Sequence, residues 1–124
     1  MDKYLNPNTE LFSYLLIQDS VSLVTDDNFG VPDKFNLSQN FPNPFNASTQ
    51  VKVILKEHSF IKLTIYNLLG KEVNILLDTQ LPAGEYSIEW DGKNSDGNIL
   101  NSGVYFIRMK ANGFQKTIKT ILMK

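Results

Sequence analysis

The sequence predicts an all-β domain, an immunoglobulin-like antiparallel β-sandwich of about seven strands. Three observations favour this class. Apolar and polar residues alternate with a period of two from residue 50 onward, and turn-forming residues interrupt the alternation about every 8 to 12 residues. No segment after residue 50 keeps the 3.6-residue period of a helix. A barrel is the alternative arrangement for strands with this spacing.

The residues ahead of the sandwich are expected to form a separate leader. Residues 10–18 are rich in apolar side chains and predict a strand or one short helix, whereas residues 20–25 predict a strand. Acids, a glycine and a proline then break the pattern over residues 26–33, as in a linker or turn. The chain therefore divides into residues 1–34, which end an upstream domain or link to it with one or two strands, and the domain 35–124.

Five segments of the domain show the alternation of half-buried strands: residues 51–55, 61–66, 86–90, 104–110 and 114–123. Turn chemistry separates them at residues 69–71, 82–84, 91–97 and 112–113. The last break is Asn112-Gly113, a pair typical of the type I′ turn, in which both central residues need positive φ. A β-hairpin is therefore expected over residues 104–123.

Trp90 is the one tryptophan of the chain. Large aromatic side chains most often fill cores, and a buried indole N–H needs an acceptor. We therefore expect Trp90 to fill the space between the sheets with its N–H donated to a backbone carbonyl. Stacking against a ligand is the alternative role.

Composition excludes several kinds of function. The absence of cysteine excludes disulfides, thiolate catalysis and cysteine-ligated zinc, and no apolar run reaches the roughly 18 residues of a membrane-spanning helix, so no membrane insertion is expected. The net charge of −1 conceals an acidic leader and a stretch after Asp96 that holds no acid. Its lysines are interpreted as solvent-facing strand residues that discourage edge aggregation. Nucleic acid is not expected as a partner, because no basic stripe with interleaved aromatics is present.

The sequence holds no catalytic constellation, so we expect neither an enzyme nor a cofactor. His58 lies in a polar link between two predicted strands and is interpreted as an exposed turn residue rather than a base. A nucleophile elbow, a P-loop and a dinucleotide fingerprint are all missing. Glu85 and Glu89 would lie about 13 Å apart on one strand face, which exceeds the spacing of glycosidase acid pairs.

One loop weakly resembles a calcium site. Asp91, Asn94 and Asp96 would supply oxygen ligands, and Asn98 is a further candidate ligand. The spacing departs from the EF-hand pattern, and no bidentate Glu closes the loop. The preferred interpretation is an Asx-rich connection, because Asp, Asn and Gly dominate tight turns for local reasons; calcium is the alternative.

The least generic segment is Phe41–Asn46, with the sequence FPNPFN. Its two prolines fix their own φ angles and bias the preceding Phe41 and Asn43 towards extended conformations. This predicts a stiff ribbon before the first regular strand. The rings of Phe41 and Phe45 are expected to pack the ribbon onto the sandwich.

This segment and the later blocks, in the same order, resemble the type A C-terminal sorting domain of the type IX secretion system. The blocks are FNLSQNFPNPFN followed by Ser48-Thr49, then IYNLLGKEV, LPAG with YSIEWDG, SGVYF, and the closing strand Lys116–Lys124. The sorting-motif residues carried over are Pro42, Asn43, Pro44, Phe45, Asn46, Gly70, Lys71, Glu72, Gly84, Trp90, Gly103, Val104, Tyr105, Lys119 and Lys124.

Two qualifications accompany this resemblance. Ala47 stands where many members of the family have a second proline, which loosens the ribbon. The Trp-Asp-Gly and Gly-Val-Tyr blocks are also similar to the immunoglobulin-like domain of flagellar hook-capping proteins. That domain is not expected to carry the Pro-Asn-Pro-Phe-Asn opening or to finish on a basic strand.

The resemblance implies a function without chemistry of its own. Such domains follow a cargo protein, are exported through the periplasm, and are recognised while folded by the type IX translocon of the outer membrane. A cell-surface sortase then removes the domain, here within residues 26–36, and the cargo is attached to the surface or released. Our hypothesis is that the final hairpin presents Gly103, Val104, Tyr105 and the last strand as a partly exposed edge suited to strand addition.

The alternative function is an extracellular binding module for glycans or for the cargo enzyme. It predicts an exposed aromatic platform on one sheet, built from Tyr66, Tyr86, Tyr105 or Phe114. The sequence leaves the identity of the cargo and the oligomeric state open.

Overall fold

The computed structural model describes residues 32–124 of the chain, so the predicted leader segments 10–18 and 20–25 lie outside the described residues. The described part forms one compact unit, Pro32–Lys124. Its strands are β2 (Asn36–Leu37), β3 (Thr49–Leu55), β4 (Ser59–Asn67), β5 (Glu72–Leu81), β6 (Gly84–Trp90), β7 (Gly103–Ala111) and β8 (Phe114–Leu122). Within these residues, no helix is long and apolar enough to span a membrane.

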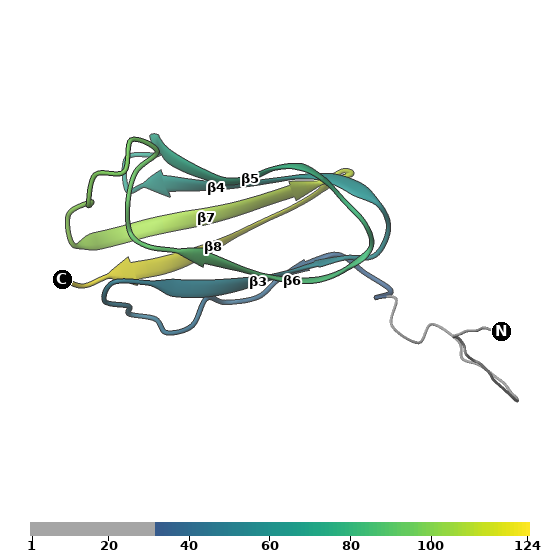
Figure 1. The fold of residues 1–124 in the computed structure, drawn as a ribbon, viewed down its shortest axis with the longest axis horizontal. Coiled ribbons are helices and arrows are strands. Elements are labelled where there is room, and N and C mark those ends of the chain that lie inside the picture. Colours follow the sequence, from purple (N-terminus) through teal and green to yellow (C-terminus); the bar gives the residue numbers. More distant parts are fainter. Residues whose placement is uncertain (1–31) are drawn as a thin grey trace, which may run out of the picture. The chain divides into compact units, whose positions relative to one another are not determined.

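The strands form two facing antiparallel sheets (Figure 1). One sheet has the order β2-β3-β6 and the other the order β5-β4-β7-β8. The chain changes sheet between β3 and β4, between β5 and β6, and between β6 and β7. The predicted immunoglobulin-like sandwich of seven strands is confirmed, and the alternative of a barrel is wrong.

Alternating burial explains why these segments form strands. Along β3 every second side chain, Val51, Val53 and Leu55, points into the core, and the same alternation runs along β4 and β7. The fully buried aliphatic residues include Ile61, Leu63, Ile65, Ile107 and Met109. Burying one such side chain stabilises the fold by about 1.5 to 3 kcal/mol. The buried residues of both sheets form one hydrophobic cluster.

Strand β5 did not show the alternation in the sequence, and its pairing explains why. Its register with β4 shifts twice, between Leu63 and Thr64 and again between Ile65 and Tyr66. Each shift leaves one β5 residue without a partner, so its side chains do not keep a period of two. The alternation of apolar and polar residues therefore did not predict this bulged edge strand. Only the family resemblance had indicated a strand there.

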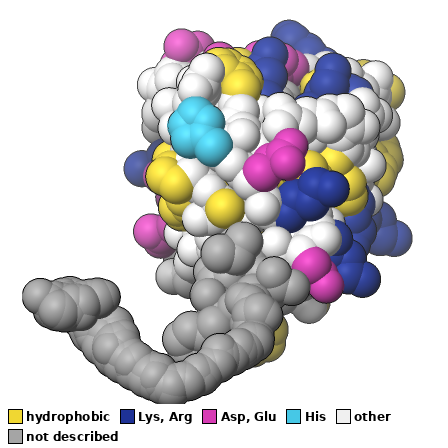
Figure 2. All heavy atoms as spheres, turned by 90° about the vertical axis from the view of Figure 1, so that its right-hand side faces the viewer, with side chains coloured by type: hydrophobic (Ala, Val, Ile, Leu, Met, Phe, Trp, Pro, Cys, Tyr) yellow, Lys and Arg dark blue, Asp and Glu magenta, His cyan; other side chains and the backbone are white. Residues whose placement is uncertain are grey.

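The strand directions gather the loops at the two ends of the sandwich. One end, here named the loop end, holds residues 38–48, 68–71, 91–102 and 123–124. The opposite end, named the Pro32 end, holds residues 32–35 and the tight connections 56–58, 82–83 and 112–113. In Figure 1 the loop end lies at the left, where the C-terminus is marked. Figure 2 shows the Pro32 end, where hydrophobic, acidic and basic side chains are intermixed over the visible part of the surface.

The predicted hairpin is present, with β7 and β8 paired from Gly103 opposite Leu122 to Ala111 opposite Phe114. Both turn residues have positive φ, 46° at Asn112 and 84° at Gly113, as a type I′ turn requires.

Replacing Gly113 with valine tests this turn. A β-branched residue is strained at a φ of 84°, so Gly113→Val is expected to lower the free energy of unfolding by about 1 to 3 kcal/mol in urea titrations. Asn112→Gly keeps the φ that the turn needs and is the control, with a change below about 1 kcal/mol. Equal stabilities of the two variants would contradict the role of the turn.

Candidate functional site

Phe45 ties the loop end together. Its side chain is only 1% exposed, and its ring lies 5.3 Å from that of Trp90, which in turn meets Tyr105 edge-on at 5.5 Å. Its backbone pairs with the last strand: the Phe45 N–H donates to Ile121 O at 2.9 Å, and the Met123 N–H donates to Phe45 O at 2.8 Å. One residue thus fills the interior and extends the four-stranded sheet.

A buried polar cluster holds Asn40, five residues before Phe45 and next to the segment Phe41–Asn46. The Asn40 side chain is 2% exposed, and its Nδ2 donates to the hydroxyl oxygens of Thr49 at 2.9 Å and of Thr120 at 2.6 Å. Thr49 begins β3 and Thr120 lies on β8, so Asn40 joins the two sheets. Satisfied buried polar groups of this kind fix one arrangement, because any other leaves them unpaired.

The segment Phe41–Asn46 differs from the extended ribbon that the prolines predicted. Its peptide bonds before both prolines are cis, and the chain arches from a bridge with β3, Phe41 opposite Gln50, to a bridge with β8, Phe45 beside Leu122. Hydrogen bonds to both sheets set this path. Phe45 is buried as expected, but the expectation for Phe41 is wrong, because its side chain is 81% exposed.

Trp90 has the predicted role in the core. It is 1% exposed, and its Nε1 donates to Lys93 O at 2.9 Å. Gly92 lets the following loop approach closely: a Cβ placed there would meet Leu122 Cδ1 at 3.3 Å and Phe45 Cε2 at 3.7 Å. The Trp-Asp-Gly block therefore packs directly on the Phe45 segment.

Two of the residues proposed for calcium, Asp91 and Asn94, cap turns with their side chains. Asp91 Oδ1 accepts the Lys93 N–H at 3.2 Å, and Asn94 Oδ1 accepts the N–H groups of Asp96 at 3.0 Å and Asn98 at 2.9 Å. The described residues contain no cluster of three or more His, Asp or Glu side chains arranged around a common point. The geometry is that of the preferred Asx-rich connection.

Most of the remaining sorting-motif residues also lie at the loop end. Gly70, Lys71 and Glu72 belong to the turn between β4 and β5 and to the first residue of β5. The Lys124 N–H donates to Ser102 Oγ at 3.0 Å, beside the start of β7. Two residues lie elsewhere: Gly84 starts β6 at the Pro32 end, and Lys119 is an exposed residue of β8.

Tyr105 is a core residue rather than a presented one. It is 7% exposed, its hydroxyl donates to Asn101 O at 2.7 Å, and burial raises the pKa of its phenol above the ordinary value. Its neighbours Gly103 and Val104 are half-buried. The expectation that Tyr105 faces a partner is therefore wrong.

The edge of β8 is also less open than expected. On its outer side Gln39 Nε2 donates to Lys119 O at 2.8 Å, and Asn43 Oδ1 accepts the Ile121 N–H at 3.0 Å. The backbone of Phe45 then pairs with Ile121 and Met123. The part of β8 nearest the loop end is closed by these contacts. Strand addition there would have to displace the Phe41–Asn46 segment.

The predicted aromatic platform is absent among the described residues. The Arg108 guanidinium covers Tyr66, with the Arg108 Cζ atom 4.8 Å from the centroid of the tyrosine ring. Phe114 stacks on Phe35 at the Pro32 end. Tyr86 pairs with inward-facing Val53 and donates its hydroxyl to a backbone carbonyl. These rings and the buried Tyr105 share no exposed face, which removes the feature expected of a glycan-binding module.

A pocket of about 480 Å³ opens at the loop end between the motif segments. Its walls come from Asn46–Ser48, Asp91–Lys93, Ile99, Leu122 and Lys124. Residues far apart in the chain therefore form one concave surface. The sequence analysis missed Ile99, although an apolar residue within a run of Asp, Asn and Gly was a signal that could have marked it.

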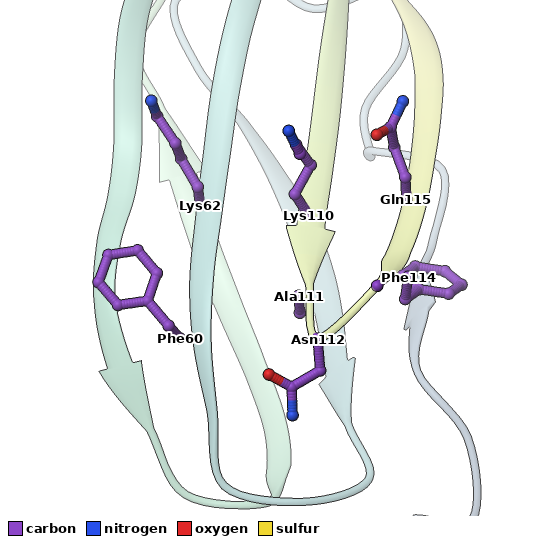
Figure 3. A pocket seen from close by; sticks show the side chains of 8 residues that line it. Phe60, Lys62, Lys110, Ala111, Asn112, Phe114 and Gln115 are labelled. Atoms are coloured by element: carbon purple, nitrogen blue, oxygen red, sulfur yellow. The ribbon is translucent and has the colours of Figure 1, made fainter.

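A second hollow, of about 310 Å³, lies at the Pro32 end. Phe60 and Lys62 of β4, Lys110 of β7 and the Asn112 turn line it (Figure 3). In Figure 3 the two lysines extend in the same direction from neighbouring strands. None of the sorting-motif residues borders this hollow.

Comparison with known families places the fold. Residues 40–113 match the family described as the FlgD Ig-like domain, which is more than half of the chain, and the chain belongs to this family. The predicted similarity to the hook-capping domain is thereby confirmed. A search of curated proteins finds no match.

Three similar solved structures are parts of longer chains, of which the match covers between 10% and 59%. PorU from Porphyromonas gingivalis is 22% identical with a TM-score of 0.59, covering 90% of this chain and 10% of PorU. PorZ of the same organism, described as a surface component of the type IX secretion system, is 19% identical with a TM-score of 0.47, covering 74% of this chain and 12% of PorZ. FlgD from P. aeruginosa is 29% identical with a TM-score of 0.45, and the match covers 60% of this chain and 59% of FlgD. The likeness to PorU concerns the fold alone.

The Asn40 cluster can be tested with two substitutions on one strand. Thr120→Val leaves an N–H of buried Asn40 without its acceptor and is expected to lower the free energy of unfolding by about 1 to 3 kcal/mol. Thr117→Val, at an exposed position of β8, is the control and should change it by less than about 0.5 kcal/mol. A neutral Thr120→Val would show that the cluster does not stabilise the sandwich.

Ala47 offers a test of the pocket wall, because its φ of 83° is closed to proline. Ala47→Pro is expected to lower the free energy of unfolding by more than about 1 kcal/mol. Ala47→Gly relieves the left-handed conformation and should leave stability unchanged or raise it by up to about 1 kcal/mol. Thermal or urea unfolding measures both, and an Ala47→Pro variant as stable as the parent would contradict this backbone conformation.

Proposed function

We propose that residues 35–124 form a non-catalytic C-terminal sorting domain, which directs an upstream cargo protein through the type IX outer-membrane translocon. The partners in this proposal are the translocon, a cell-surface sortase and the cargo. The route runs through the periplasm to the cell surface or the medium, and a cut within residues 26–36 separates the domain from the cargo. The domain itself supplies no chemistry and no cofactor.

The observation that carries the proposal is the convergence of the motif blocks at the loop end. Asn40 of the opening block and Thr120 of the closing strand are 80 residues apart in sequence, yet they hydrogen-bond in the interior. Phe45 of the first block packs on Trp90 of the third and pairs with the last strand. A signal that is read in the folded state needs such a fixed surface, which exists only once all blocks have assembled.

The position of the incoming chain agrees with this role. The described unit begins at Pro32, at the end of the sandwich opposite to the loop end. The loop end is therefore the end of the sandwich farther from Pro32, so contacts made there do not involve the residues around Pro32.

A reporter fusion tests the proposal. Residues 35–124 are joined to a reporter carrying a Sec signal, and the reporter outside the cell is measured in a host with a functional type IX translocon. Export is expected in this host, whereas a translocon-deficient strain should keep the fusion in the periplasm. The reporter without the domain is the control for leakage.

Two outcomes would overturn the proposal: a fusion that stays in the periplasm of the competent host, or equal release from both strains. Truncation of the last residues is a poor variant for this purpose, because it removes β8, which pairs with β7 over its whole length, and so tests folding rather than recognition.

A further inference from the structure

The exposed apolar residues of the described chain are unevenly distributed. Six large hydrophobic side chains are at least half exposed, and five of them lie at the loop end: Phe41, Leu68, Leu69, Ile99 and Met123. Only Phe60 lies at the Pro32 end. Single exposed hydrophobic residues are normal on proteins, but their accumulation in one region marks an interaction site.

Hydrogen-bonded turns carry two of these side chains, Leu69 and Ile99. Asn67 Oδ1 accepts the N–H groups of Leu69 at 3.0 Å and Lys71 at 2.9 Å, and the Gly70 N–H donates to Asn67 O at 2.9 Å. Leu69 is nevertheless 93% exposed at the tip of this turn. Turn chemistry favours polar residues at such a tip, so folding does not account for a leucine there.

The loop that carries Ile99 is fixed in the same way. Lys93 and Ile99 form a bridge, the Leu100 N–H donates to Gly92 O at 3.0 Å, and Ile99 remains 65% exposed. The Ser95 N–H donates to Val73 O at 3.0 Å, which holds this loop against the start of β5, near the Leu68-Leu69 turn. Surfaces that are ordered before binding lose little entropy when a partner docks.

The pocket beside Ile99 indicates which chemistry fits. Its volume of about 480 Å³ is in the range of sites that enclose small groups, and Ala47, Ile99 and Leu122 give it aliphatic walls. Lys93 and Lys124 also line it. The lining holds two lysines and one acid, Asp91, so its positive charges outnumber its negative charge by one.

We infer that the loop end is a protein-docking surface, on which Leu68, Leu69 and Ile99 bind an apolar segment of a partner protein while the pocket takes one of its apolar side chains beside a carboxylate. The inference rests on the proposed function, because it assigns to this surface the contact with the export machinery. Apolar anchors supply the binding energy, and the lysines select an acidic partner.

The experiment uses the reporter fusion with two sets of variants and matched controls. Leu68→Ser, Leu69→Ser and Ile99→Ser are combined in one fusion, and Phe60→Ser, at the exposed hydrophobic position of the Pro32 end, is the control. Lys93→Glu with Lys124→Glu forms the second set. Its control is Lys62→Glu with Lys110→Glu, since these lysines line the other hollow (Figure 3).

The apolar variant and the charge variant are each expected to lower the rate of export about tenfold or more, as truncated anchor residues do, while both controls export at the parent rate. Melting temperatures of the purified domains test whether each variant folds. Lys62 and Lys93 are half-buried, and the other changed side chains are exposed.

The outcomes separate the two proposals. Absence of export for the parent fusion overturns the proposed function. Normal export of the parent and of the apolar variant overturns the docking surface alone, and a loss of export as large in the Phe60→Ser control does the same. Normal export of the charge variant, with loss in the apolar one, overturns the acidic nature of the partner.

Discussion

The contact on which the rest of the structure depends is that of Phe45 with the last strand and the core. Its backbone pairs with Ile121 and Met123, while its ring lies against Trp90. A sandwich of two sheets leaves its strand edges and its open end exposed to water unless another segment covers them. Here the short segment Phe41–Asn46, which we call the arch, covers both. The Phe45 backbone occupies the edge of β8, and the Phe45 side chain closes the interior.

Asn40 makes the position of this arch specific. Apolar burial alone tolerates small shifts, whereas an amide that donates to hydroxyl groups on two different sheets does not. The arch is thereby fixed relative to both sheets. Gly92 then allows the loop after Trp90 to lie directly against Phe45 and Leu122. Contacts with these core residues therefore determine where the pocket walls lie.

Much of the fold was predictable because the alternation rule depends on one property, the burial of a single face. It located β3, β4, β6, β7 and β8, and the Asn112-Gly113 pair gave the correct turn. It missed β5, where bulges interrupt the period, and the two-residue β2. The path of the Phe41–Asn46 arch was also mispredicted, because local proline preferences favoured an extended chain while hydrogen bonds to distant strands decided its course. The closed edge of β8 and the burial of Tyr105 also depend on contacts between distant parts of the chain, so the local sequence pattern did not predict them.

The loop end contains two kinds of residue: buried ones that stabilise the fold and exposed ones that are available for binding. Phe45, Trp90 and Asn40 are almost completely buried, so substituting them changes the stability of the whole domain. Leu69 and Ile99 make little contact with the core, and their turns are maintained by Asn67, Asn94 and backbone hydrogen bonds. Changing these exposed side chains is therefore expected to have little effect on folding. On the proposed docking surface, a substitution at an exposed tip can therefore change binding while the sandwich beneath it stays the same.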